Sequence, residues 1–363
     1  MIISIILVVL FLSVLVVVHE FGHFIAAKLF GITVLEFGVG FPPAILRRKI
    51  GETVYSVNAI PAGGFVRLKG EERSEQSLPD RQAGEQHPNA PVDSDRFGRF
   101  SDAAWWKRAL VIVGGVSMNF IVGWLLISFI FMIGIPGGLI ITGVAPGSPA
   151  ETAGMKEGDK IISLIAPDAR FLADGDMIAR RFSEFIDAHR GDRITAEVTR
   201  GGETERFGVV PRVHPPEGEG AMGVAIIEEG ITPQPFFRSL REGFTFSLKL
   251  IQMFFGFIGE AIAGRADFRQ ISGPVGIVKV ASEAGRAGIT PITQLVALIS
   301  LNLAVINILP FPALDGGRLL FLILEKIKGS PLPLSFERYA NMVGFALLIA
   351  LLVVVTVKDI IQF

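Results

Sequence analysis

The sequence predicts a polytopic α-helical membrane protein. It has four transmembrane helices, a cytoplasmic β-loop associated with the membrane, and one small extracytoplasmic β-rich domain. Half of the 363 residues are hydrophobic and the mean hydropathy is positive, which is outside the range of soluble globular proteins. Four stretches are apolar and long enough to cross a bilayer, which takes about 20 helical residues. Lysine and arginine gather in alternate loops between these stretches, as in multi-pass proteins.

The charge and the cysteine count exclude several classes of function. The formal net charge is −1, so the chain has no overall basic field and we expect no nucleic-acid partner. The chain has no cysteine, which excludes disulfides, thiolate catalysis and cysteine-liganded zinc sites. Any metal site must therefore use histidine, aspartate, glutamate or water.

The first predicted span occupies residues 1–30, with an apolar run over Ile2–Leu29. It lacks the basic start of a signal peptide, and its apolar run is longer than the usual signal-peptide core. The run ends in a polar cluster that cleavage would discard. We therefore expect a retained transmembrane helix.

Three further spans are predicted at 109–133, 293–317 and 339–357, and residues 318–338 connect the last two. A fifth segment, Phe244–Ala263, is long enough to cross, but Lys249, Gln252 and Glu260 interrupt it. That pattern favours an amphipathic helix lying in the membrane interface, over about residues 236–264, within a periplasmic linker at 214–292.

Residues 31–108 form the loop between the first two spans. Short alternating runs with glycine and proline predict a β-hairpin at about 50–70. The following segment, about 71–103, is polar and poor in aliphatic side chains, so we expect it to be disordered. Trp105 and Trp106, with Lys107 and Arg108 after them, are typical of an anchor at the membrane surface.

The β-rich domain is predicted at 135–213. Its sequence indicates a short helix at Pro149–Ala153, a strand at Lys160–Leu164, an amphipathic helix around Phe182–Ile186 and a hairpin turning at Gly201–Gly202. The loops at 31–108 and 318–338 carry the basic residues nearest the spans. They are therefore expected in the cytoplasm, with the β-rich domain and both termini on the periplasmic side.

The motif His19-Glu20-Phe21-Gly22-His23 lies near the end of the first span. Residues i and i+4 share one helical face, so both imidazoles can bind one metal ion. Glu20 projects beside them, where it can act as general base on a metal-bound water. The alternative is a polar contact between helices. Because ionisable side chains inside a membrane are costly and usually functional, the metal site is favoured.

A catalytic zinc site needs a third protein ligand, with the fourth position open. The candidate is Asp315, after the third span; the alternative for its Asp-Gly-Gly sequence is a simple turn. The remaining histidines, His87, His189 and His214, are expected to be solvated. His19 lies about 25 Å along the first span, near its cytoplasmic end. Asp315 emerges at the same depth only if Phe244–Ala263 does not cross.

Asn302 and Asn307 lie on the third span, ahead of Pro310 and Pro312, which break regular helical hydrogen bonding. Irregular backbone at membrane depth is tolerated where it is buried or lines a cavity. These groups can pair with an extended peptide or stabilise an oxyanion. The alternative is ordinary hydrogen bonding between helices.

The chain resembles the site-2 protease family of intramembrane zinc metalloproteases, most closely the bacterial regulator-of-sigma-E protease type. The resemblance covers nearly the whole chain: HEFGH in the first span, GGFVRLKGE in the cytoplasmic loop, a PDZ-like outer domain, ISGPVGIVKVA before the third span and NILPFPALDGG at its end. It implies one zinc ion held by His19, His23 and Asp315, with Glu20 as catalytic base.

The resemblance also implies a substrate-binding role for Asn302 and Asn307. The segment containing Gly63, Gly64 and Phe65 is implied to engage substrate as an added β-strand. Better-known members of this type carry two tandem PDZ domains, whereas this sequence indicates one. Its PGGLIITGV segment is expected to offer a strand edge to a peptide ligand; the alternative is a domain that only shields the active site.

We therefore expect an enzyme of the bacterial inner (cytoplasmic) membrane that cleaves single-span membrane proteins surrounded by lipid. Its products would be released regulators, such as an anti-sigma factor, or cleared remnant signal peptides. One alternative is a non-proteolytic PDZ adaptor with a structural zinc, but such a site closes its fourth position and has no use for Glu20. Another is a metal transporter, which would need a polar path across the whole membrane.

Overall fold

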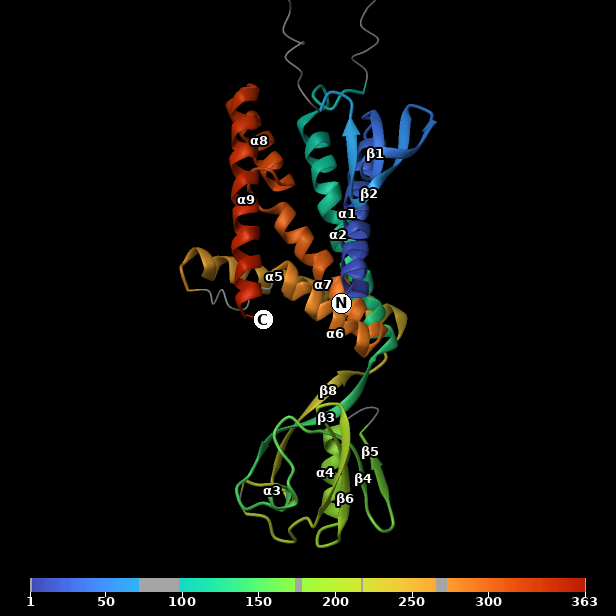
Figure 1. Ribbon diagram of the computed structural model, residues 1–363, viewed down its shortest axis with the longest axis vertical. Helices are drawn as coiled ribbons and strands as arrows, with labels where there is room; N and C mark the ends of the chain where they lie inside the picture. Colours follow the sequence, from blue (N-terminus) through green and yellow to red (C-terminus); the bar gives the residue numbers. More distant parts are fainter. Residues whose placement is uncertain (1, 72–97, 174–177, 217, 266–272, 363) are drawn as a thin grey trace, which may run out of the picture. The chain divides into compact units, whose positions relative to one another are not determined.

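The computed structural model describes residues 2–71, 98–173, 178–216, 218–265 and 273–362 (Figure 1). The chain divides into two compact units. Unit 1 comprises Met1–Ile127 and Gly243–Phe363, and unit 2 comprises Ser128–Glu242. Most of the segment predicted to be disordered, with His87, lies outside the described residues.

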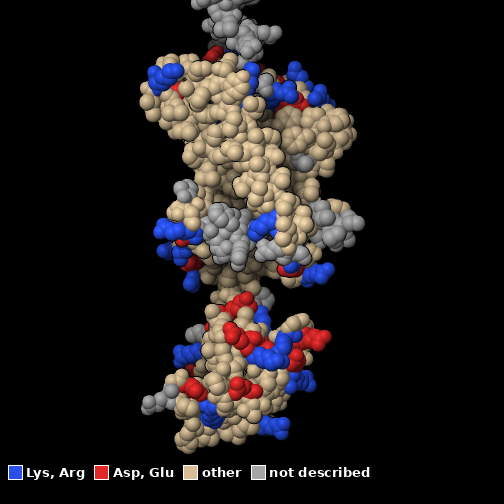
Figure 2. All heavy atoms as spheres, turned by 60° about the vertical axis from the view of Figure 1, so that its left-hand side comes forward, with Lys and Arg blue, Asp and Glu red and all other residues tan. Residues whose placement is uncertain are grey.

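The prediction of four helices able to span a membrane is confirmed within the described residues. They are α1 (Ile2–Leu29), α2 (Trp105–Ile133), α7 (Ile289–Ile308) and α9 (Leu334–Gln362). On the face of unit 1 shown in Figure 2, the described surface has a broad band without charged side chains, bounded at both ends by charged ones. Such a band is what lipid contact requires.

Helix α5 (Phe236–Ile262) occupies the segment predicted to lie in the interface. It is not among the four candidate spans of the described residues. In unit 1 it runs across the direction of α1 and α9 (Figure 1). Both observations agree with an interfacial helix.

The third span is shorter than predicted. Helix α7 ends at Ile308, and Asp315 begins a separate helix, α8 (Asp315–Lys328), inside the segment predicted as a plain connection. The break follows from Pro310 and Pro312, which donate no backbone hydrogen bond. A further helix that the sequence did not predict, α6 (Pro274–Ala287), precedes α7.

The hairpin in the first loop begins well before the predicted residues 50–70. Strand β1 (Val34–Ile50) pairs with β2 (Thr53–Leu68). The first half of β1 pairs with both halves of β2, so four segments lie in the order 44–50, 53–58, 34–39 and 64–68. The two outer pairs are antiparallel, whereas 36–39 runs parallel to 54–57. Glycines and prolines in β1 interrupt its alternation, which is why the sequence did not predict it. Residues 64–68 form one edge of this sheet.

That edge is packed against α1 immediately before the HEFGH motif. A Cβ atom at Gly63 would lie 3.3 Å from Val16 Cγ1, and one at Gly64 would lie 3.2 Å from Val17 Cγ2. Glycine therefore allows the strand to approach the helix closely. The strand is thereby positioned one turn of helix from His19.

Unit 2 contains a six-stranded sheet with the order β7-β6-β4-β3-β8, in which β5 pairs with β4. Helices α3 (Pro149–Ala153) and α4 (Ile178–Ala188) and the turn at Gly201–Gly202 lie at the predicted positions. The strands are β3 (Ile135–Val144), β4 (Lys160–Ile165), β5 (Arg170–Leu172), β6 (Ile194–Arg200), β7 (Glu203–Val209) and β8 (Val224–Ile231).

Two expectations for this unit were wrong. Strand β8 lies beyond the predicted limit of 213, in the segment predicted as linker, and pairs with β3 from Ile135–Ile231 to Val144–Val224. Because β3 also pairs with β4 at Leu139 and Ile140, the middle of the PGGLIITGV segment is internal and offers no free edge there. The sheet edge on this side is β8.

The expectation that His189 is solvated was also wrong. Its side chain is buried, with Nδ1 2.7 Å from the Phe185 carbonyl oxygen and Nε2 3.0 Å from Asp168 Oδ1. The Phe185 carbonyl and the Asp168 carboxylate raise the pKa of His189 above its usual value, in spite of burial. His214, in contrast, is exposed as expected.

We expect unit 2 to lose stability as pH rises through the raised pKa of His189. A histidine whose pKa is raised in the folded state contributes its full stabilisation at pH values below its unfolded-state pKa of about 6.5. This contribution is lost as the pH rises above the folded-state pKa. Calorimetry of the intact chain in detergent, at about pH 6 and about pH 8, should show less pH dependence for His189→Gln than for wild type. His214→Gln is the control. Equal pH dependence in wild type and His189→Gln would contradict the assignment.

Candidate active site

Three potential metal ligands converge between α1 and the start of α8. The distances from Asp315 Oδ2 are 2.9 Å to His19 Nε2 and 3.2 Å to His23 Nε2. The two histidine Nε2 atoms are 3.2 Å apart. Among the described residues, these three side chains form the group able to hold a metal ion.

The spacing of the three donor atoms suits zinc. Zinc binds histidine nitrogen and carboxylate oxygen at about 2.0–2.2 Å in tetrahedral geometry, so its ligand atoms lie about 3.3 Å apart. The three observed separations, between 2.9 and 3.2 Å, are close to this value. Two histidines and one carboxylate also leave a fourth position open, as in catalytic sites.

The backbone of α2 fixes the protonation of His23. Its Nδ1 lies 2.8 Å from the Val111 carbonyl oxygen, which can only accept a hydrogen bond. Nδ1 therefore carries the proton, and the lone pair of Nε2 is free to bind a metal.

Glycines on both helices make this contact possible. A Cβ atom at Gly22 would lie 2.2 Å from the Gly114 carbonyl oxygen, so α1 and α2 cross at backbone contact. A Cβ atom at Gly115 would lie 2.4 Å from His23 Nε2 and 2.8 Å from His19 Cε1. Small residues permit such an approach in membrane helices. The two imidazoles therefore occupy space that any larger residue at position 115 would fill.

Asn119 is a site residue that sequence reasoning did not identify. It is fully buried on α2, with Nδ2 3.3 Å from His19 Nδ1, and its backbone carbonyl accepts a 2.8 Å hydrogen bond from Ser300. Asn119 Oδ1 is buried without a hydrogen-bond partner among the described residues. Exchanging the amide oxygen and nitrogen would let Oδ1 accept from His19 Nδ1–H. His19 Nε2 would then be available to the metal.

The Asp-Gly-Gly sequence places Asp315 beneath the turn that ends α7. A Cβ atom at Gly316 would lie 2.1 Å from the Leu309 carbonyl oxygen, and one at Gly317 would lie 2.3 Å from the Phe311 carbonyl oxygen. α8 can therefore begin against the preceding backbone only with glycine at both positions. The Asp-Gly-Gly sequence therefore forms the predicted turn and, in the same place, positions the predicted ligand.

Glu20 lies beside the three donor atoms and is not one of them. Its Oε2 accepts a 3.1 Å hydrogen bond from the Val66 backbone N–H of β2. A cavity of about 650 Å³ is lined by Glu20, His23 and Asp315 together with β2 residues 65–68. The carboxylate thus faces a space large enough for a peptide, next to the donor group.

Comparison with known proteins identifies the family. The model of peptidase family M50 matches residues 7–351. The chain belongs to peptidase family M50. A relative from Synechocystis sp., provisionally named a zinc metalloprotease, is 35% identical over 96% of this chain and 92% of its own. Proteins named zinc metalloprotease RasP are 30% identical in Oceanobacillus iheyensis, over 97% of each chain, and 29% identical in Geobacillus kaustophilus, over 99% of this chain and 98% of the relative.

In this M50 peptidase, the residues predicted to bind substrate lie in two separate places, on β2 and on α7. Phe65 lines the cavity beside Glu20, and Gly63 and Gly64 lie against α1. Asn302 and Asn307 are partly buried on α7 and are not among the described residues lining that cavity. Five residues of helix rotate a side chain by about 140°, so these two asparagines point from different faces.

Substitution of Asn119 should weaken zinc binding by the M50 peptidase. Loss of a residue that orients a metal-bound histidine typically costs about 10- to 100-fold in affinity. We expect this range for Asn119→Ala, measured by competition with a fluorescent zinc chelator. Ser117→Ala, at an exposed position on the same helix, is the control. Unchanged zinc affinity in Asn119→Ala would show that Asn119 does not orient His19.

Proposed function

We propose that this M50 peptidase is an intramembrane zinc metalloendopeptidase that cleaves single-span membrane proteins. The observation that carries the proposal is the donor triangle of His19, His23 and Asp315 at tetrahedral zinc spacing. Two of its members lie on a helix able to span a membrane. The membership of the chain in a peptidase family and the names of its relatives support hydrolysis of peptide bonds.

In the proposed mechanism, His19, His23 and Asp315 hold the metal and Glu20 moves the proton. Zinc, when bound, acts as a Lewis acid and makes hydroxide available near neutral pH. The Glu20 carboxylate accepts a proton from the attacking water and returns it to the leaving amine nitrogen. The position of Glu20 beside the donor atoms, but outside the group, supports this role.

The substrate is proposed to bind as an extended strand on the edge of β2. A peptide bond in a hydrogen-bonded transmembrane helix is protected, so the substrate must unwind locally before it is cut. The edge at Gly63, Gly64 and Phe65 supplies backbone partners for such a strand. Asn302 and Asn307, near the proline-broken end of α7, are proposed to hold the strand from outside the cavity beside Glu20.

The location and the role of unit 2 are also part of the proposal. The protein is assigned to the bacterial inner membrane, with residues 31–108 in the cytoplasm and both termini and unit 2 in the periplasm, because basic residues favour that orientation. Unit 2 is proposed to be a single PDZ-like domain. If it takes a peptide ligand, the free edge of β8 is where a strand can be added.

The deciding experiment is cleavage of a tagged single-span membrane protein by the purified chain in detergent, with bound zinc measured in parallel. We expect one zinc per chain, cleavage within the membrane segment, loss of both after chelation and recovery on adding zinc. An anti-sigma factor and a remnant signal peptide are suitable substrates. Bound zinc without product from any substrate would favour the PDZ adaptor and reject the peptidase.

A further inference from the structure

Two backbone N–H groups on the outer edge of β2, beside the metal ligands, already donate to carboxylates. The Val66 N–H donates to Glu20 Oε2 at 3.1 Å, and the Leu68 N–H donates to Glu71 Oε2 at 3.2 Å. Residues two apart in a strand direct their N–H groups to the same side. Both donors therefore point away from the partner strand, and they are satisfied by one side chain from α1 and one from the turn that follows β2.

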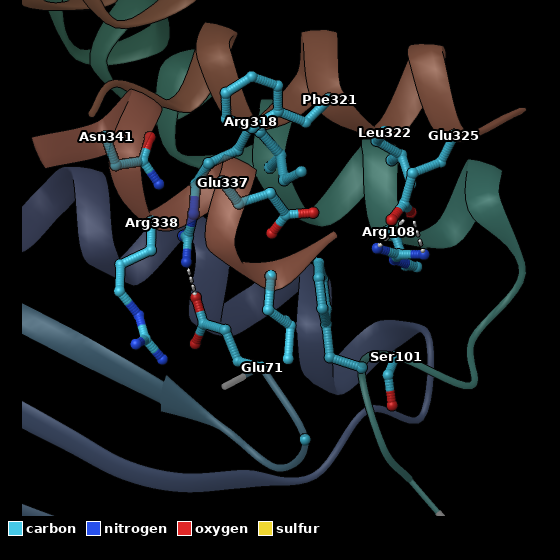
Figure 3. Close-up of a pocket in the computed structure, with 14 residues that line it drawn as sticks. Glu71, Ser101, Arg108, Arg318, Phe321, Leu322, Glu325, Glu337, Arg338 and Asn341 are labelled. Carbon is cyan, nitrogen blue, oxygen red and sulfur yellow. Dashed lines mark hydrogen bonds and ion pairs between the residues drawn. The ribbon is translucent and has the colours of Figure 1, made fainter. Parts of the chain in front are cut away.

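Glu71 is held in this position by Arg318. The Arg318 guanidinium donates to Glu71 Oε1, and Figure 3 shows the two side chains meeting between the end of the hairpin and α8. Arg318 lies one turn after Asp315, and its backbone N–H donates to the Leu314 carbonyl at 3.2 Å. The ion pair thus links the end of the β1–β2 hairpin to α8, the helix that begins with the proposed ligand Asp315.

The same ion pair stands between two cavities. Glu71 and Arg318 line the 650 Å³ cavity that contains Glu20, and they also line a second cavity of about 590 Å³. The second cavity extends over α8 toward Arg338 and Asn341 of α9 (Figure 3). Only 17% of the Glu71 side chain is exposed, whereas half of the Arg318 side chain is exposed. Arg318 is therefore the more accessible member of the pair.

We propose that Glu71, held by Arg318, is a removable cap on the docking edge of β2. The inference rests on the proposed function, since it assumes that substrate docks on this edge. A carbonyl of an extended substrate can accept from Leu68 N–H only after the Glu71 carboxylate has left. Substrate must therefore compete with Glu71, and the pair sets how easily a strand enters.

A second ion pair lining the same second cavity provides a matched control. Arg108 of α2 donates to Glu325 of α8 at 3.4 Å, and Glu325 also accepts from the Leu332 N–H at 3.0 Å. This pair joins two helices, and neither of its residues belongs to β2. A change at Glu325 removes a comparable ion pair without opening the strand edge.

The test measures affinity for an uncleaved single-span substrate in the Glu20→Gln background, in which the amide oxygen can still accept from Val66. Adding Glu71→Ala or Arg318→Gln should tighten binding about five-fold, the order of one hydrogen bond. Adding Glu325→Gln should leave affinity unchanged. Unchanged or weaker binding with Glu71→Ala and Arg318→Gln would overturn the cap.

A reversible lock tests the same idea by replacing the ion pair with a covalent bridge that cannot move away. The natural chain has no cysteine, so Glu71→Cys with Arg318→Cys introduces the only two thiols. A short bis-methanethiosulfonate linker between them should abolish substrate binding, and dithiothreitol should restore it. Full binding by the linked protein would overturn the proposal. Zinc content and cleavage by the wild-type protein are measured alongside. Absence of zinc or of cleavage in the wild type would contradict the proposed peptidase function, whereas a result on the linked protein bears on the cap alone.

Discussion

Replacing Glu20 with glutamine is expected to abolish cleavage and leave zinc in place. Glutamine has nearly the same shape, and its amide oxygen can accept the Val66 N–H as Glu20 does at 3.1 Å. It cannot take a proton from water. Loss of a general base costs about 10²- to 10⁴-fold in rate. The three donor atoms are untouched, because Glu20 is not among them.

The measurement is the single-turnover cleavage rate together with zinc per chain, for wild type, Glu20→Gln and Asp315→Asn. Asp315→Asn is the contrasting variant, since an amide is a poorer metal ligand than a carboxylate and should lose both zinc and activity. If Glu20→Gln also lost its zinc, Glu20 would be a ligand and the proton would need another carrier. If Glu20→Gln kept wild-type activity, the proposed mechanism would be wrong.

Local patterns in the sequence were sufficient to predict the two proposed metal ligands on α1, which the structure places within ligand distance of each other. The i, i+4 spacing of His19 and His23 depends only on helical geometry, and the length of the apolar run locates it in a span. The prediction of Asp315 required one further step, which was to count the spans and find on which side of the membrane the third one ends. That count depended on α5 not crossing. The structure brings Asp315 Oδ2 to 2.9 Å from His19 Nε2, so the two halves of the prediction agree.

What the sequence did not predict depends on contacts between distant segments. Asn119 stands among apolar residues of α2, and only its depth in a span hinted at a role; its proximity to His19 comes from the crossing of α1 and α2 at glycine. Strand β8 is paired with β3 some 80 residues earlier, and no local turn fixes that register. The contact of Glu71 with Leu68 similarly requires the edge of β2 to be known.

A methyl group at position 115 is expected to destroy the metal site, although glycine there binds nothing. The Cβ atom of Gly115→Ala would lie 2.4 Å from His23 Nε2 and 2.6 Å from His23 Cε1. The backbone contact of Gly22 with Gly114, one residue away, prevents α2 from rotating to relieve this overlap. Either His23 leaves its place or the helices separate, and in both cases the donor triangle opens. Zinc affinity should fall by more than the roughly 10- to 100-fold caused by loss of an orienting residue.

Zinc affinity and cleavage would be measured for Gly115→Ala and for Gly259→Ala in α5, where an added Cβ meets no atom within 4 Å. The control should behave as wild type, because alanine in an open helical position costs nothing in packing. Excess zinc should not restore activity to Gly115→Ala, since the geometry and not the supply of metal is changed. Retained zinc with normal cleavage in Gly115→Ala would mean that the helices tolerate a wider crossing. In that case the close contact of α1 and α2 would stabilise the fold without defining the site.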